Sequence, residues 1–216
     1  MRSPGRSLSL STTAFSSPES LSEWLRPRLP SDTFALWGVK PGTKTVHNLW
    51  LEIEHGETSL NSNHSPQTLP LRTVNVATVR IRNRAGSMLI ESHQLLSDGT
   101  VRYRERPLSE KMKPGESVEE AATRAVSEEL GPRIVKILPG TYVVKEEERA
   151  SVSYPGLPAR YVLHSVEAEV DGLSEEDGEF STDEFSEGCD YDDLQTAGKT
   201  VFVKKHFWKW VATDAQ

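Results

Sequence analysis

One helix constrains the fold of this chain more than any other feature of the sequence. Ser117 and Glu120 have the spacing of a capping box, in which each side chain bonds the other residue's backbone amide. Gly131, followed by Pro132, is a typical C-terminal stop. These signals predict a helix over residues 116–131, and the rest of the fold has to pack around it.

The predicted helix turns an acidic residue toward its apolar face. At about 100° per residue, Val118, Ala122 and Val126 lie on one arc, and Glu129 falls between the first two of them. Glu128 lies at the edge of the arc. A carboxylate in an apolar surface is costly unless a partner compensates it. Two adjacent carboxylates over small residues suit a hard divalent cation such as Mg²⁺, completed by substrate phosphates and water.

Strand patterns surround this helix. Alternating or β-branched segments predict strands over residues 73–81, 88–93, 100–105, 134–138, 141–145, 160–170, 200–203 and 206–211. Asp98-Gly99 is a two-residue hairpin signal. The sequence therefore predicts one α/β (α+β) domain over residues 72–212.

The N-terminal 71 residues differ in composition from that domain. Residues 1–18 are rich in Ser and Arg and contain no acid, which fits either a transit peptide or a disordered tail. Residues 19–71 form an extension and a linker. Within them, the alternation over residues 44–54 predicts a half-buried strand, and residues 56–71 predict a loop.

Composition excludes several classes of protein. Net charge is 25 − 32 = −7, so general binding of nucleic acid is not expected. The single cysteine, Cys189, excludes an intrachain disulfide framework and fits a reducing compartment. No apolar run is long enough to span a bilayer. We expect an intracellular protein, in a chloroplast or mitochondrion if residues 1–18 are a presequence and otherwise in the cytoplasm.

A segment near the C-terminus is strongly acidic. Residues 175–193 are dense in Asp and Glu, and such a density of like charge repels itself. The pattern predicts a mobile loop.

The helix and its approach resemble the signature of the Nudix family. That signature is a Gly, five residues, a Glu, seven residues, then Arg-Glu, an aliphatic, any residue, Glu-Glu, any residue, Gly and an aliphatic. Here Glu116 is followed by SVEEAAT and then by RAVSEELGP, and Pro114-Gly115 precedes it. The resemblance implies a mixed β-sheet sandwiched by helices over residues 72–212.

The resemblance also implies roles for the matching residues. Glu128 and Glu129 would bind Mg²⁺ or Mn²⁺ and serve catalysis, Arg124 would orient these carboxylates, and Gly115 with Glu116 would anchor the loop to the helix.

The signature is incomplete at three positions. The expected Gly before Glu116 is Glu110, the Glu expected after Arg124 is Ala125, and the final aliphatic is Pro132. The missing Glu assists metal binding or acts as a base in the family. A positioned general base contributes roughly 10²–10⁴-fold to a rate, so its loss weakens catalysis without abolishing it.

Arginines alternate along the predicted strand that leads into this loop. Arg102, Arg104 and Arg106 therefore lie on one side of the strand. Guanidinium groups match phosphate geometry, so Arg104 and Arg106 are candidate phosphate ligands, although a solvated outer face gives the same pattern.

Two functions fit these features. The first is a metal-dependent hydrolase that cleaves diphosphate linkages in nucleoside diphosphate derivatives, with weakened or altered catalysis. The second is a catalytically inactive module of the same fold that senses a nucleotide-type small molecule or docks a protein partner. The sequence leaves the substrate, the oligomeric state and the role of residues 19–71 open.

Overall fold

The computed structural model describes residues 15–61, 69–173, 178–184 and 202–212. The helices are α1 (Pro18–Leu25), α2 (Ser31–Phe34), α3 (Val46–Glu54) and α4 (Val118–Leu130). The strands are β1 (Ser59–Asn61), β2 (Leu71–Ile81), β3 (Met88–Leu96), β4 (Val101–Arg106), β5 (Leu108–Lys111), β6 (Val135–Ile137), β7 (Val143–Ala150), β8 (Pro158–Val170), β9 (Glu179–Asp183) and β10 (Val203–Val211).

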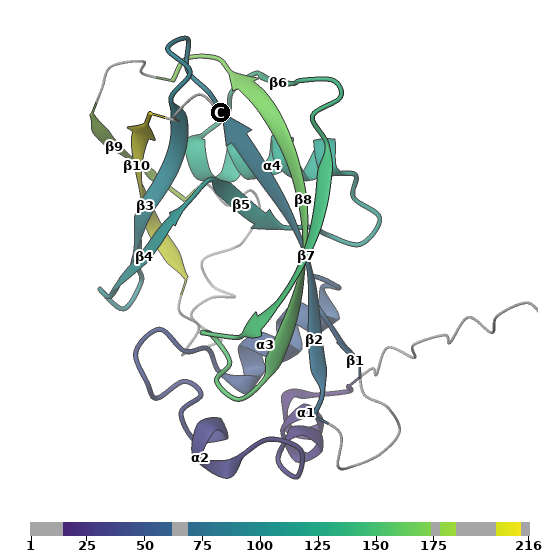
Figure 1. Ribbon diagram of the computed structural model, residues 1–216. Coiled ribbons are helices and arrows are strands. Elements are labelled where there is room, and N and C mark those ends of the chain that lie inside the picture. Colours follow the sequence, from purple (N-terminus) through teal and green to yellow (C-terminus); the bar gives the residue numbers. More distant parts are fainter. Residues whose placement is uncertain (1–14, 62–68, 174–177, 185–201, 213–216) are drawn as a thin grey trace, which may run out of the picture.

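The strands form two sheets. In the first, β2 and β8 run parallel at the centre, β1 and β5 pair with β2, and β6 and β7 pair with β8, all four antiparallel. The second is antiparallel throughout, in the order β4-β3-β10-β9. Figure 1 shows β2 and β8 continuing below the second sheet toward the N-terminal helices. The expected α+β class with a mixed sheet is confirmed.

Helix α4 packs against both sheets, in contact with β2, β5, β6 and β8 of the first and β9 of the second. The capping box of Ser117 and Glu120 is present, and Gly131 ends the helix at φ 86°, a backbone conformation that favours glycine. Its buried face joins the main core, together with Leu89, Leu108 and Trp208. Both predicted ends of the helix are correct to within two residues.

The N-terminal extension forms a second core instead of a strand and a linker. The prediction of a strand over residues 44–54 is wrong, because Thr45 caps helix α3 in a capping box with Asn48. Leu49, Leu51 and Ile53 alternate as in a strand, but Val46, Leu49 and Ile53 also have the spacing of three and four residues that is typical of a helix. The second core is formed by residues of α1, α3, β1, the segments before and after α1 and α2, and the β7–β8 connection: Phe15, Leu21, Leu25, Leu29, Trp37, Leu49, Leu60, Tyr154 and Leu157.

Two further predictions about the extension need correction. Packing begins at Phe15, whose ring meets Trp24, and helix α1 begins at Pro18, so the ordered extension starts earlier than residue 19. The loop predicted over residues 56–71 contains strand β1, in which Leu60 is fully buried. The presequence question concerns residues 1–14, which lie outside the described residues.

A buried charge cluster joins the extension to the domain. Glu52 accepts ion pairs from Lys44 at 2.7 Å, Arg72 at 2.7 Å and Lys111 at 2.9 Å. We call these four residues the extension cluster. Burial would raise the pKa of Glu52, but the three cations hold it well below its usual value.

The extension also touches the loop that precedes α4. Gly56 has a φ of +70°, and a Cβ there would lie 2.2 Å from Cγ of Pro114. Lys111 of β5 pairs with Glu57 at 2.8 Å. The extension therefore supports the loop that positions α4.

The acidic segment is structured in part. Residues 179–183 form the edge strand β9, so a mobile loop is the wrong prediction for them. Phe180 packs on the main core, and Thr182 accepts a hydrogen bond from the Trp208 indole at 2.8 Å. Apolar and hydroxyl contacts thus outweigh charge repulsion here. The rest of the predicted loop, apart from Gly178 and Glu184, lies outside the described residues.

No helix within the described ranges is long and apolar enough to cross a membrane.

Candidate functional site

A cavity of about 660 Å³ opens between the end of α4, strand β5 and the inner face of the second sheet. Its lining is mostly polar and charged. It includes Arg102 and Arg104 from β4, Glu110 from β5, Glu129 from α4, Glu184 after β9, and His206 from β10. Elements far apart in the chain therefore bring acids and bases to one place.

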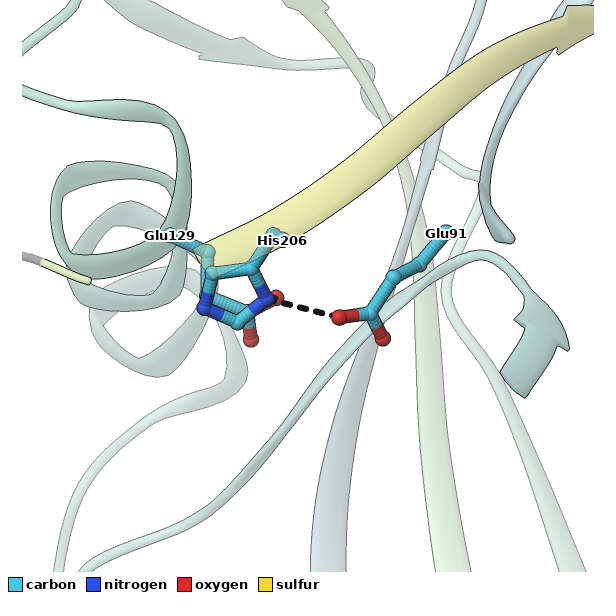
Figure 2. A group of neighbouring side chains, drawn as sticks. All are labelled: Glu91, Glu129 and His206. Carbon is cyan, nitrogen blue, oxygen red and sulfur yellow. Dashed lines mark hydrogen bonds and ion pairs between the residues drawn. The ribbon is translucent and has the colours of Figure 1, made fainter. Parts of the chain in front are cut away.

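Glu129 and His206 line this cavity, and Glu91 lies beside His206 (Figure 2). Nδ1 of His206 lies 2.6 Å from Oε1 of Glu91 and 3.4 Å from Oε2 of Glu129. All three residues are at most 4% exposed. Nε2 of His206 is hydrogen-bonded to Glu184. We call Glu91, Glu129, Glu184 and His206 the cleft cluster.

The charges of the cleft cluster are unequally compensated. Burial would lower the pKa of His206, but its hydrogen bonds with Glu184 and Glu91 raise that pKa to about 10. Burial would raise the pKa of Glu91, but the His206 bond and the charge of Arg104 keep it below its usual value. In contrast, burial and the neighbouring Glu91 raise the pKa of Glu129 well above its usual value. Glu129 is therefore the carboxylate that lacks a full counter-charge.

Glu129 also has an unused ligand atom. Its Oε2 is buried and accepts no hydrogen bond from the described residues. One ligand atom each from Glu91, Glu129 and His206 lies within 4.8 Å of the other two. Two carboxylates and an imidazole suit a divalent cation, and the nitrogen ligand favours Mn²⁺ or a later transition metal over Mg²⁺. The donor set fits a metal ion.

One more glutamate, Glu110, borders the cluster. Glu110 lines the same cavity, and its side chain makes no hydrogen bond or ion pair with any described residue. Burial raises the pKa of Glu110, and Glu128 and Glu184 raise it further, against the opposing charges of Lys111 and Arg124. Glu110 is thus a carboxylate that can take a proton or a cation.

Arg124 holds the loop before α4 against the helix. Its guanidinium donates to Glu116 at 2.8 Å, to Glu128 at 2.9 Å and to the carbonyl of Lys111 at 2.7 Å. Glu116 in turn accepts from the amide of Lys113 at 2.8 Å. Gly115 takes a φ of +75° in this turn. These contacts tie the loop to the helix, and the roles expected of Arg124, Gly115 and Glu116 in metal binding and catalysis stay predictions.

The two adjacent acids of α4 have different environments. Glu129 belongs to the cleft cluster, whereas Glu128 is half-buried and pairs with Arg124 at 2.9 Å. Glu128 also lines a separate open pocket on the outer side of α4. The structure therefore places Glu129, and not Glu128, in the three-residue ligand group.

The arginine row lies on the inner side of β4. Arg104 donates to Oε2 of Glu91 at 3.0 Å, which ties it to the cleft cluster. Arg106 lines the adjoining cavities, and its Nε is buried with no hydrogen-bond partner in the described part of the chain. The alternative of a solvated outer face does not apply to either residue.

Sequence reasoning missed Glu91 and His206. They are 115 residues apart, so no local spacing links them. A weaker signal was present, since Glu91 follows Leu89 and His206 precedes Trp208 at the two-residue spacing of a buried strand face. A buried polar residue on such a strand face is costly without a partner, so this position could have identified Glu91 and His206 as candidate site residues.

Comparisons with known proteins identify the family of the chain. A model of the NUDIX domain matches residues 71–211. Among solved structures, a NUDIX hydrolase from Nitrosomonas europaea is similar at 18% identity and a TM-score of 0.33, over 47% of this chain and 62% of that one. The match therefore spans less than two thirds of that protein. No curated protein matches the chain. Because the family model covers well over half of the sequence, this chain belongs to the NUDIX domain family.

Proposed function

We propose that the protein is a metal-dependent hydrolase of diphosphate linkages in nucleoside diphosphate derivatives, with its metal centre built on Glu129, Glu91 and His206. The observation that carries this proposal is the buried Oε2 of Glu129, which accepts no hydrogen bond from the described residues and lies beside two other ligand atoms. A carboxylate in that state is stabilised by a cation. The family membership supports hydrolysis as the chemistry.

The chain's own residues would divide the work around the phosphates. A divalent cation supplies positive charge that stabilises phosphoryl oxygens in the transition state. Arg104, already fixed by Glu91, would bind a phosphate oxygen from the β4 side. Arg124 would keep the loop and helix in register through Glu116 and Glu128.

Glu110 would supply the carboxylate that the family signature lacks at Ala125. Ala125 is fully buried in the main core, whereas Glu110 lines the cavity beside Glu129. The carboxylate missing at Ala125 would therefore be replaced by the carboxylate of Glu110. With its raised pKa, the Glu110 carboxyl would accept a proton from the attacking water or add a ligand to the cation.

The test compares the two adjacent acids of α4. Phosphate release from a panel of nucleoside diphosphate derivatives is measured with Mn²⁺ and with Mg²⁺, for wild type, Glu129→Gln and Glu128→Gln. We expect turnover that is faster with Mn²⁺, a loss of at least about 10²-fold in Glu129→Gln and a smaller loss in Glu128→Gln. Equal activity of wild type and Glu129→Gln would exclude the proposed centre.

One observation favours the second function, a binding module without catalysis. His206 already lies between Glu91 and Glu184 with a pKa of about 10, so a protonated imidazole can occupy the place of a cation. In that case nucleotides would bind without metal, and no member of the panel would be cleaved. Metal-independent binding without turnover in wild type identifies this function.

A further inference from the structure

Beyond the cleft cluster lies a second cavity, of about 340 Å³, whose charged lining is all basic. Five arginines line it, from β2, β4 and β7, and no described Asp or Glu does: Arg72, Arg102, Arg104, Arg106 and Arg149. Repulsion between arginines in so small a space is unfavourable unless an anion neutralises it.

Three of these arginines form no ion pair with a described residue. Arg72 pairs with Glu52 and Arg104 with Glu91. Arg102 donates only to the neutral Gln94 side chain, at 2.8 Å, and burial together with Arg104 lowers its pKa to about 10. Neither Arg106 nor Arg149 forms an ion pair with any residue that the structure describes. The cavity therefore holds unpaired positive charge.

The remaining contacts hold this charge in place. The Arg149 guanidinium lies 4.4 Å from the centre of the Tyr161 ring. Arg102 and Arg104 line both this cavity and the cavity of the cleft cluster. The two cavities therefore adjoin, and a ligand bound at Glu129 can extend past Arg102 and Arg104 into the second cavity.

We propose that this cavity is a second phosphate subsite, in which Arg102, Arg106 and Arg149 bind a phosphate group remote from the diphosphate linkage at Glu129. The substrate class is then a nucleoside diphosphate derivative that carries an additional phosphate monoester. Guanidinium forks match phosphate oxygens bidentately. The cavity volume suits one such group, while the net charge of −7 disfavours a long polyanion. The identity of the substrate rests on the proposed hydrolase, but binding of an anion here does not.

The test uses inorganic tripolyphosphate as the probe, titrated by calorimetry in the presence of EDTA. Wild type is compared with Arg106→Gln, Arg149→Gln and the control Arg160→Gln. Arg160 precedes Tyr161, belongs to the opposite face of β8 and pairs with Glu148 at 2.7 Å. We expect about 10-fold to 100-fold weaker binding in each cavity variant and unchanged binding in the control.

Arg149 is exposed, so its replacement should leave the fold intact. Thermal melts of all four proteins check that weaker binding does not come from misfolding. Absence of tripolyphosphate binding in wild type, or equal affinity in all four proteins, overturns the subsite. If all four proteins bind tripolyphosphate equally and wild type cleaves nucleoside diphosphate derivatives, the subsite is wrong and the proposed hydrolase stands. Arginine-dependent binding without any turnover supports the subsite and removes the hydrolase.

Discussion

Two buried charge clusters, one on each side of strand β5, differ in how completely their charges are matched. In the extension cluster, one carboxylate, Glu52, faces three cations. In the cleft cluster, three carboxylates surround His206, and Oε2 of Glu129 accepts no hydrogen bond from the described residues. In the first arrangement, cations of the chain pair with both oxygens of Glu52. In the second, we propose that a cation pairs with the oxygen of Glu129 that accepts no hydrogen bond from the described residues.

Strand β5 sets these two environments with adjacent residues. Glu110 lines the cleft cavity, while Lys111 pairs with Glu52 and Glu57. Successive side chains of a strand point to opposite faces, so one short strand serves both clusters. The comparison teaches that buried charge is paired within the chain at one cluster, whereas at the other it leaves a carboxylate that we propose binds a cation.

The largest expected effect comes from breaking the complete cluster. Glu52→Ala leaves Arg72, whose side chain is 5% exposed, without its counter-charge. We expect the free energy of unfolding to fall by about 3–5 kcal/mol, the usual cost of removing one partner of a buried pair. Urea unfolding followed by circular dichroism measures it. A loss under about 1 kcal/mol would place Glu52 among ordinary surface pairs.

The matching change in the cleft should have the opposite sign for stability. Glu129→Gln removes an uncompensated buried carboxylate and keeps its shape, so without metal we expect stability to rise by about 1 kcal/mol. Added Mn²⁺ should raise the melting temperature of wild type and leave the variant unchanged. Destabilisation of the metal-free variant would mean that Glu129 is already satisfied.

The dependence of the unfolding free energy on pH should also differ between the two clusters. The folded pKa of Glu52 lies below its unfolded value, so its stabilisation is full above that value, near 4.5, and is lost as the pH falls further. Unfolding free energies measured from pH 6 to pH 3 should therefore fall less steeply in Glu52→Gln than in wild type. Identical slopes in the two proteins would contradict the compensated state of Glu52.

The smallest expected effects come from the two neighbours on β5. Glu110→Gln should weaken Mn²⁺ binding, by about 10-fold, with little change in stability. Lys111→Met should cost about 1 kcal/mol, since its side chain is 24% exposed, and leave Mn²⁺ binding unchanged. Calorimetry and urea unfolding measure both quantities in each variant. If Lys111→Met weakened Mn²⁺ binding and Glu110→Gln lowered stability, the assignment of Glu110 to the cleft and Lys111 to the extension cluster would be wrong.

The sequence predicts those parts of the fold that depend on local signals. The capping box and Gly131 set the ends of α4, and helical geometry turns Glu129 inward, as the structure shows. Helix α3 escaped prediction because its apolar residues fit both periods, and only the Thr45 cap separates them. Strand β9 escaped because its composition is acidic and its stability comes from contacts with β10 and α4.

The site was predictable only where it depends on one element. Arg124, Glu116 and Glu128 lie on one helix and its loop, so their spacing was informative. The partners of Glu129 come from β3 and β10, and strand pairing brings them together. Such long-range pairing leaves no spacing in the sequence, which is why the metal centre was expected at Glu128 and Glu129 alone.

The central claim is that the cleft cluster lacks one cation, and electron paramagnetic resonance of added Mn²⁺ tests it most directly. Titration of metal-free protein should show one bound Mn²⁺ per chain in wild type and in Glu52→Gln, and none in Glu129→Gln. Free Mn²⁺ at every ratio in wild type, or equal binding in Glu129→Gln, would contradict the claim.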